Sequence, residues 1–254
     1  MDPLLDFTGK SVLITGAAQG FGYLIAESLA QRGAKLIISD INEAGINEVA
    51  KGLSTKGYEV IGIKCDVAKE AQCQHLVEAA IKHYGQLDIA INNAGIAPSV
   101  LMPLHLTDEH TIDRQFSVNV KGVQFGMKHQ ITQMLLQNEG VILNVSSMAG
   151  LGGAAYISSY AAAKHAVLGL TKSAAVEYAT KNIRINAVCP FFTLTKMVTD
   201  SGLTSSLEAL SEGTPMKRLA KPAEIVDVML MLISPKNTYM TGQCIAIDGG
   251  LSAC

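Results

Sequence analysis

The chain has 254 residues, and its 20 Lys and Arg against 22 Asp and Glu give a formal net charge of −2. This near balance excludes the concentrated positive charge by which proteins bind nucleic acid or anionic lipid. Hydrophobic residues make up 48% of the chain and charged residues 17%, a composition that excludes intrinsic disorder. The length suits one large α/β domain or two small ones.

Cysteine usage favours reduced thiols over a disulfide framework or a zinc site. The five cysteines are odd in number and include no C-x-x-C pair, and the six histidines show no metal-ligand spacing. We therefore expect a cytoplasmic protein with no bound metal. The first residues carry Asp2 and Asp6 and no basic segment before an apolar run, so they do not resemble a signal peptide. No window reaches the ~18 apolar residues of a membrane span.

Short apolar segments alternate with longer segments of helical periodicity. Strands are predicted at residues 11–15, 35–40, 59–64, 87–92, 141–145, 183–188 and 244–247. Helices are predicted at residues 23–32, 42–56, 69–84, 107–136 (one helix or two), 158–180 and 222–233. Apolar strands alternating with helices indicate a parallel sheet covered on both faces, and the right-handed crossover rule favours a doubly wound order. We predict a single α/β domain of Rossmann type over residues 1–254, with a mainly parallel seven-stranded sheet flanked by helices on both faces.

A glycine-rich turn, T-G-A-A-Q-G-F-G at residues 15–22, lies between the first predicted strand and the first predicted helix. Glycines there allow a pyrophosphate to approach the free N–H groups of the helix N-terminus. The spacing departs from the common G-x-G-x-x-G pattern. Asp40 ends the second strand, roughly 20 residues further on, where a carboxylate accepts from a ribose 2′-hydroxyl and repels a 2′-phosphate. The pattern favours NAD over NADP, and the alternative for Asp40 is a capping role.

Tyr160 and Lys164 lie four residues apart in a predicted helix, so their side chains share one face. A free Tyr has a pKa of about 10, and a nearby cation is expected to lower it by favouring the phenolate. Such a phenol could take a proton from an alcohol or return one to a carbonyl. Tyr–Lys pairs at this spacing are common, so a solvated surface pair is the alternative.

These motifs occur with others in an order that resembles the classical type of the short-chain dehydrogenase/reductase family, from Phe7 to Gly250. The matching segments are the glycine turn, Asp66, N-N-A-G at residues 92–95, Asn119, Ser147, Tyr160-x-x-x-Lys164 and Pro190. The resemblance implies a Rossmann-type oxidoreductase that transfers hydride between NAD and a secondary alcohol or its ketone.

The resemblance also implies four catalytic residues. Tyr160 would be the general acid/base, with its pKa lowered by Lys164, which would also bind the nicotinamide ribose. Ser147 would polarise the substrate oxygen, and Asn119 would hold a water that connects Lys164 to solvent. Two alternatives stay open: Ser146 could be the only buried serine of its pair, and Asn119 could merely bond backbone at a helix bend.

The cofactor contacts implied by the resemblance are spread over several loops. The glycine turn would hold the pyrophosphate, Asp40 the adenosine ribose, and the residues after the third and fourth strands the adenine side; Asp66 could instead cap a turn. Thr193 and Thr195 would meet the nicotinamide carboxamide. The full set is Gly16, Gln19, Gly20, Phe21, Gly22, Asp40, Ile41, Asp66, Val67, Asn93, Ala94, Gly95, Tyr160, Lys164, Pro190, Thr193 and Thr195.

The connection at residues 191–219 is long for this fold and is predicted to be a substrate-binding loop or lid. Relatives often carry glycine after the proline of this loop, so Phe191 is expected to strain the backbone. The expected pocket lining is apolar and favours a neutral secondary alcohol or ketone. It comprises Ala97, Pro98, Met148, Ala154, Ala155, Tyr156, Leu194, Met197 and Val198.

Small and apolar residues lie on more than one face of the long helices at residues 107–136 and 158–180, which indicates contact with further copies of the chain. Relatives commonly associate through these helices, and we expect a homotetramer. Two other functions stay open: an NADP-dependent 3-oxoacyl-type reductase and a regulator that binds NAD without chemistry.

Overall fold

The computed structural model describes residues 2–98, 100–194 and 207–253. It contains a seven-stranded sheet in the order β3-β2-β1-β4-β5-β6-β7, in which every neighbouring pair is parallel. The strands are β1 (Ser11–Thr15), β2 (Lys35–Asp40), β3 (Val60–Lys64), β4 (Ile89–Asn92), β5 (Gly140–Val145), β6 (Ile183–Pro190) and β7 (Cys244–Ile247). The predicted Rossmann-type doubly wound fold is confirmed.

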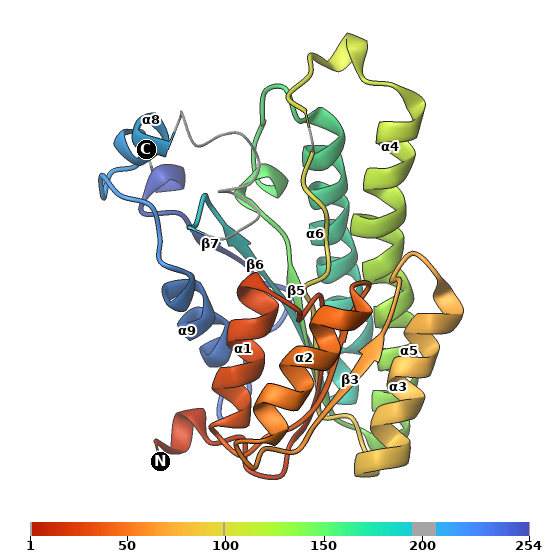
Figure 1. Cartoon of the computed structure of the whole chain (residues 1–254). Coiled ribbons are helices and arrows are strands. Elements are labelled where there is room, and N and C mark those ends of the chain that lie inside the picture. The colour runs from red at the N-terminus through yellow and green to blue at the C-terminus, as the bar shows by residue number, and fades with distance from the viewer. Residues whose placement is uncertain (1, 99, 195–206, 254) are drawn as a thin grey trace.

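Helices cover both faces of the sheet (Figure 1). One face carries α1 (Gly20–Ala30), α2 (Glu43–Ser54) and α9 (Pro222–Ile233), and the other carries α3 (Glu70–Tyr84), α4 (Glu109–Phe116), α5 (Gly122–Gln137) and α6 (Ser158–Tyr178). Neighbouring strand residues point to opposite faces: Val12 and Ile14 pack in one hydrophobic cluster, and Leu13 packs in the other. A strand buried on both sides is apolar throughout, which explains the unbroken segments in the sequence.

Glycines end three helical segments where the sequence predicts them to end. Gly33, Gly57 and Gly85 have φ angles of +82°, +87° and +79°, a left-handed conformation that side chains with a Cβ rarely adopt. The segment predicted at residues 107–136 consists of α4 and α5 joined by a π-helical stretch, Ser117–Lys121. Within the predicted lid, the short helix α8 (Leu207–Glu212) was not expected. No described helix is both long and apolar enough to cross a membrane.

The strand order reverses between β1 and β4, whose carboxyl ends lie side by side with those of β5 and β6. Ligands of doubly wound sheets bind at this kind of switch point. The loops that follow these strands carry the glycine turn, the N-N-A-G segment, Ser147 and Phe191, so the topology brings the predicted site residues to one edge.

Candidate active site

The glycine turn connects β1 to α1, and its glycines are required by geometry. Gly16 and Gly20 have φ angles of +67° and +58°, and a Cβ on Gly16 would stand 2.7 Å from the Cα of Ala94. A Cβ on Gly22 would collide with the carbonyl oxygen of Gly16. The turn therefore leaves the first N–H groups of α1 uncovered by side chains, as pyrophosphate binding needs.

Asn93 fastens this turn to the end of β4. Its Nδ2 donates to the carbonyl oxygens of Thr15 and Gly16, each at 2.9 Å. The hydroxyl of Thr15 accepts from the backbone N–H groups of Asn93 and Ala94, each at 3.1 Å. These bonds join the glycine turn to the segment after β4. Asn93 therefore holds the backbone of the turn in place.

Asp40 and Asp66 each cap a local turn. The carboxylate of Asp40 accepts from the N–H of Ala18 at 3.1 Å and from the N–H of Asn42 at 3.0 Å. Asp66 accepts from the N–H of Ala68 at 3.0 Å. The capping role named as an alternative for both is thus present. One bond to each oxygen of Asp40 leaves acceptor capacity for a ribose hydroxyl, so capping and binding are compatible.

Tyr160 and Lys164 share one face of α6, and Ser147 faces them from the loop after β5. The Nζ atom of Lys164 lies 5.6 Å from the centre of the Tyr160 ring and donates to the carbonyl oxygen of Val145 at 2.9 Å. The Ser147 side chain lies close enough to the Tyr160 phenol to lower its pKa. Ser146 is buried and donates to the carbonyl oxygen of Lys164 at 2.9 Å, so it has a structural role. Of the two serines, Ser147 is the one at the phenol.

The pKa of Tyr160 is raised, whereas the sequence analysis expects Lys164 to lower it. Burial raises the pKa of the Tyr160 phenol above its ordinary value, and the bond with Ser147 offsets part of the rise. Burial lowers the pKa of the Lys164 ammonium to about 8. Lys164 was expected to lower the pKa of Tyr160, but this is not the dominant effect. Desolvation of the phenol outweighs the attraction to the Lys164 ammonium, which is hydrogen-bonded to Val145.

Asn119 lies in the π-helical stretch and is fully buried. Its Oδ1 accepts from the N–H of Ile96 at 2.9 Å, and its Nδ2 donates to the carbonyl oxygen of Ile96 at 3.0 Å and to Oε1 of Gln115 at 2.7 Å. A Cβ on Gly95 would stand 2.9 Å from Oδ1 of Asn119 and 3.5 Å from Nζ of Lys164. The backbone-bonding alternative is thus observed, and the same bonds hold Asn119 beside Lys164.

A cavity of about 570 Å³ opens beside Tyr160. Of the predicted lining, Ala97, Pro98 and Tyr156 are correct. Met148 instead packs against the cluster of Leu168 and Cys189. Ala154, Ala155 and Leu194 do not line this cavity, and Met197 and Val198 lie outside the described residues.

The sequence analysis missed the wall that α4 contributes to this cavity. That wall is polar: Asp108, His110, Thr111, Arg114 and Gln115. The four-residue spacing of Gln115 and Asn119 was a usable signal, because it places both side chains on one helix face. Tyr156, at the opposite side, has a φ of +66°, and its carbonyl oxygen accepts from the N–H of Met102 at 2.8 Å. Non-glycine residues in this conformation concentrate at binding sites.

The loop after β6 follows Pro190 and is anchored to Ile247 at the end of β7 and to Ala220, whose carbonyl oxygen accepts from the N–H of Leu194 at 3.3 Å. The N–H of Phe191 donates to the carbonyl oxygen of Ile247 at 3.0 Å, and the Thr193 hydroxyl donates to the carbonyl oxygen of Phe191 at 2.9 Å. Phe191 has no positive φ, so the expectation of strain at this position is wrong. Thr193 is buried with its hydroxyl engaged in this turn, and Thr195 lies outside the described residues.

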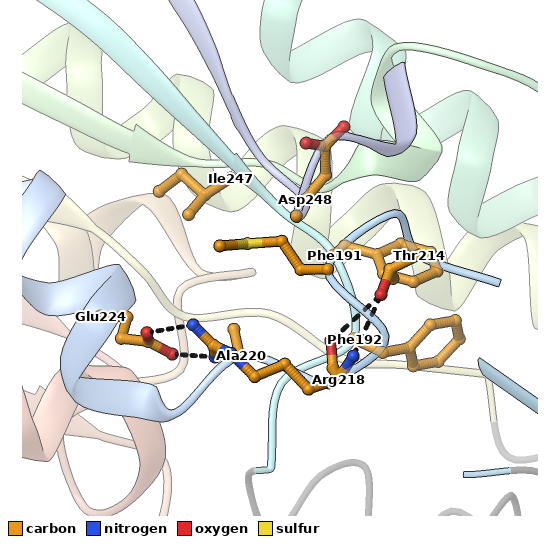
Figure 2. A pocket seen from close by; sticks show the side chains of 10 residues that line it. Phe191, Phe192, Thr214, Arg218, Ala220, Glu224, Ile247 and Asp248 are labelled. Carbon is orange, nitrogen blue, oxygen red and sulfur yellow. Dashed lines mark hydrogen bonds and ion pairs between the residues drawn. The ribbon is translucent and has the colours of Figure 1, made fainter. Parts of the chain in front are cut away.

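Phe191 and Phe192 pack edge to face, with ring centres 4.9 Å apart. They line a second cavity of about 150 Å³, opposite an ion pair in which Arg218 donates to both oxygens of Glu224 at 2.7 Å (Figure 2). Thr214 bonds the backbone of Arg218 in the same view. The aromatic pair thus forms one wall of a cavity between this loop and the segment that leads into α9.

Among the described residues, no group of three His, Cys, Asp or Glu side chains is arranged to hold a metal ion. Cys65, Cys73, Cys189 and Cys244 are free thiols.

A doubly wound sheet with a glycine turn at its switch point, a Tyr–Lys pair and a facing serine defines a dinucleotide-binding oxidoreductase. The family model described as enoyl-(acyl carrier protein) reductase matches residues 16–252. The chain is 38% identical to the cis-4-hydroxycyclohexanecarboxylate dehydrogenase of Sinomonas cyclohexanicum, over 97% of this chain and 98% of that protein. The crystal structure of a levodione reductase is similar with a TM-score of 0.94 and 35% identity, over 98% of this chain and 99% of that chain.

The chain belongs to the short-chain dehydrogenase/reductase family, classical type. It is an oxidoreductase that acts on an alcohol or a ketone with a nicotinamide cofactor. Two similar structures differ in cofactor. A 3-ketoacyl-(acyl-carrier-protein) reductase from Brucella melitensis is complexed with NADH (TM-score 0.90, 34% identity, 97% of this chain and 100% of that chain). ElxO has NADP bound (TM-score 0.90, 32% identity, 96% and 99%).

Proposed function

We propose that this protein is an NAD-dependent dehydrogenase or reductase that interconverts a neutral, mainly apolar secondary alcohol and its ketone. The observation that carries the proposal is that Tyr160 lines a cavity of about 570 Å³, with Ser147 near its phenol and the Nζ atom of Lys164 5.6 Å from the centre of its ring. A bound nicotinamide supplies hydride transfer to or from the substrate carbon. This chain then has to bind the two reactants together and move one proton.

In the proposed mechanism, Tyr160 exchanges that proton with the substrate oxygen. Ser147 donates to the same oxygen and so stabilises the negative charge that develops on it. The ammonium of Lys164, with a pKa of about 8, favours the phenolate when the alcohol is oxidised. Asn119 positions the segment at Ile96 and a water next to Lys164, which returns protons to solvent.

The preference for NAD over NADP rests on Asp40 and its neighbour. Asp40 has acceptor capacity for a 2′-hydroxyl, and its charge would repel a 2′-phosphate. Ile41, which follows it, is 66% exposed and offers no cation to such a phosphate. The cofactor contacts proposed for Gly16, Gly20 and Gly22 are supported by the position of this turn at the N-terminus of α1 and by the positive φ angles of Gly16 and Gly20.

The remaining proposals concern substrate, assembly and location. The hydroxycyclohexanecarboxylate dehydrogenase acts on a cyclic alcohol by name, and we infer a substrate of similar size. The opposite charges of Asp108 and Arg114 in the cavity wall favour a neutral substrate. Exposed apolar side chains on α4, α5 and α6, such as Ile112, Leu136 and Val176, support the homotetramer. A cytoplasmic location follows from the cysteine usage.

The direct test is oxidation of a panel of secondary alcohols, followed by absorbance of the reduced cofactor, with NAD and NADP in parallel. Turnover with NAD at a higher kcat/KM than with NADP is expected. A strong preference for NADP would favour the 3-oxoacyl-type reductase instead. Tight binding of NAD without turnover on any alcohol or ketone would favour the regulator.

A further inference from the structure

The hydrogen bonds of Asn119 determine how the amide of Gln115 is oriented. The backbone of Ile96 fixes Asn119, because its N–H donates to Oδ1 and its carbonyl oxygen accepts from Nδ2. The second proton of that Nδ2 points to the Gln115 side chain at 2.7 Å. A donor requires an acceptor, so the Gln115 atom that faces Asn119 is the oxygen. The NH₂ group of Gln115 therefore points away from Asn119.

The burial of Gln115 and the cavity that it lines indicate where this NH₂ group points. Gln115 is 3% exposed, and its Nε2 donates to no atom of the described residues. In this part of the chain the fully buried side-chain nitrogens and oxygens without a hydrogen-bond partner are Ser11 Oγ and His129 Nε2. Nε2 of Gln115 is not one of them. Gln115 and Tyr160 line the same cavity, so the geometry points to an NH₂ group that faces this cavity.

A nearly buried donor without a protein acceptor makes the binding site selective. A ligand without an acceptor at this position displaces the water that bonds the N–H groups and leaves them without a hydrogen bond. A ligand with an oxygen at this position replaces the bond to water. Gln115 projects from α4 and Tyr160 from α6, on different walls of one cavity. A single molecule whose reacting carbonyl meets Tyr160 can thus present a second oxygen to Gln115.

We propose that Gln115 is a specificity-determining residue whose Nε2 donates to a second oxygen of the substrate, a carbonyl or hydroxyl separate from the reacting carbon. The inference rests on the proposed function and narrows its substrate class to diketones and hydroxyketones with their reduced forms. A neutral second oxygen fits better than a carboxylate, because Asp108 and Arg114 offset each other in the same wall.

Two ketones of equal ring size test the proposal: cyclohexane-1,4-dione, which has a second oxygen, and cyclohexanone, which does not. The measured quantity is the ratio of their kcat/KM values with NADH. Gln115→Met removes the donor. Gln115→Glu, whose carboxyl has an ordinary pKa of about 4.3 and is ionised at neutral pH, keeps an acceptor for Asn119 but turns an acceptor toward the cavity. Gln124→Glu on the exposed face of α5 is the matched control.

We expect the dione-to-ketone ratio to fall by about 10- to 100-fold in both Gln115 variants and to stay at the wild-type value in Gln124→Glu. An unchanged ratio overturns the proposal. Equal losses on both ketones also overturn it, because they would mean that Gln115 acts only by holding Asn119. No turnover of either ketone by the wild type contradicts the proposed function itself, whereas turnover with an unchanged ratio contradicts this inference alone.

Discussion

Gly22 lies so close to Asn93 that a Cβ on the glycine would stand 2.6 Å from the Asn93 Nδ2 atom. That nitrogen already donates to Thr15 and Gly16, so it has little freedom to move. Gly22→Ala is therefore expected to lower the affinity for NADH by at least about tenfold and the free energy of unfolding by about 1–3 kcal/mol. Fluorescence titration and thermal unfolding measure the two effects.

Gly52→Ala is the matched control for this substitution. Gly52 lies within α2, and a Cβ there would meet no atom within 4 Å. Alanine is the better helix former, so this variant should gain about 0.5–1 kcal/mol and bind NADH as the wild type does. Equal behaviour of the two alanine variants would mean that the close packing at Gly22 has no energetic effect.

Cofactor preference should respond to Asp40, the last residue of β2, and to Ile41, which follows it. Replacing Asp40 by Ser and Ile41 by Arg removes a carboxylate and adds a cation at an exposed position. We expect the ratio of kcat/KM for NAD over NADP to fall by about 100-fold, since a 2′-phosphate gains a partner and loses a repulsion. The loss of the bonds to Ala18 and Asn42 affects both cofactors, so it cancels in the ratio. An unchanged ratio would show that Asp40 only caps its turn.

Lys164 should make the stability of the protein depend on pH in the alkaline range. Its pKa is about 8 in the folded protein and 10.5 ordinarily, so between these values the unfolded chain binds more protons. The free energy of unfolding therefore rises with pH through this window. Relative to Lys164→Met, the wild type should gain about 3 kcal/mol by pH 10.5, at about 1.36 kcal/mol for each pKa unit. Urea unfolding at several pH values measures this difference, and parallel curves for the two proteins would contradict it.

The sequence predicted the fold well because its signals are local. Apolar segments of strand length and the helix-ending glycines at positions 33, 57 and 85 identify the strands and helices of a fold with a parallel sheet. The strand order of such a sheet then brings the loops of the site to one edge, at the switch point. The predicted bounds of α9 and β7 agree with the structure to the residue. The start of α1 was placed three residues late, because the last glycines of the turn already belong to the helix.

Features that depend on tertiary contacts were not predictable in this way. Helical spacing relates Gln115 to Asn119, but it does not reveal that their face meets the segment at Ile96. The Tyr160–Lys164 spacing is correct, yet the pKa of the phenol follows its burial, which periodicity does not quantify. Phe191 is accommodated without strain because the backbone of Ile247 and the Phe192 ring support it, and both contacts are remote from local sequence rules.

In the proposed mechanism, the phenolic hydroxyl of Tyr160 moves the proton of the reaction. Tyr160→Phe removes this oxygen and retains the ring, so the packing of α6 and the cofactor site should be preserved. We expect kcat for the best substrate of the alcohol panel to fall at least about 1,000-fold while the dissociation constant for NADH stays close to the wild-type value. Turnover retained in Tyr160→Phe, with the same affinity for NADH, would contradict the account.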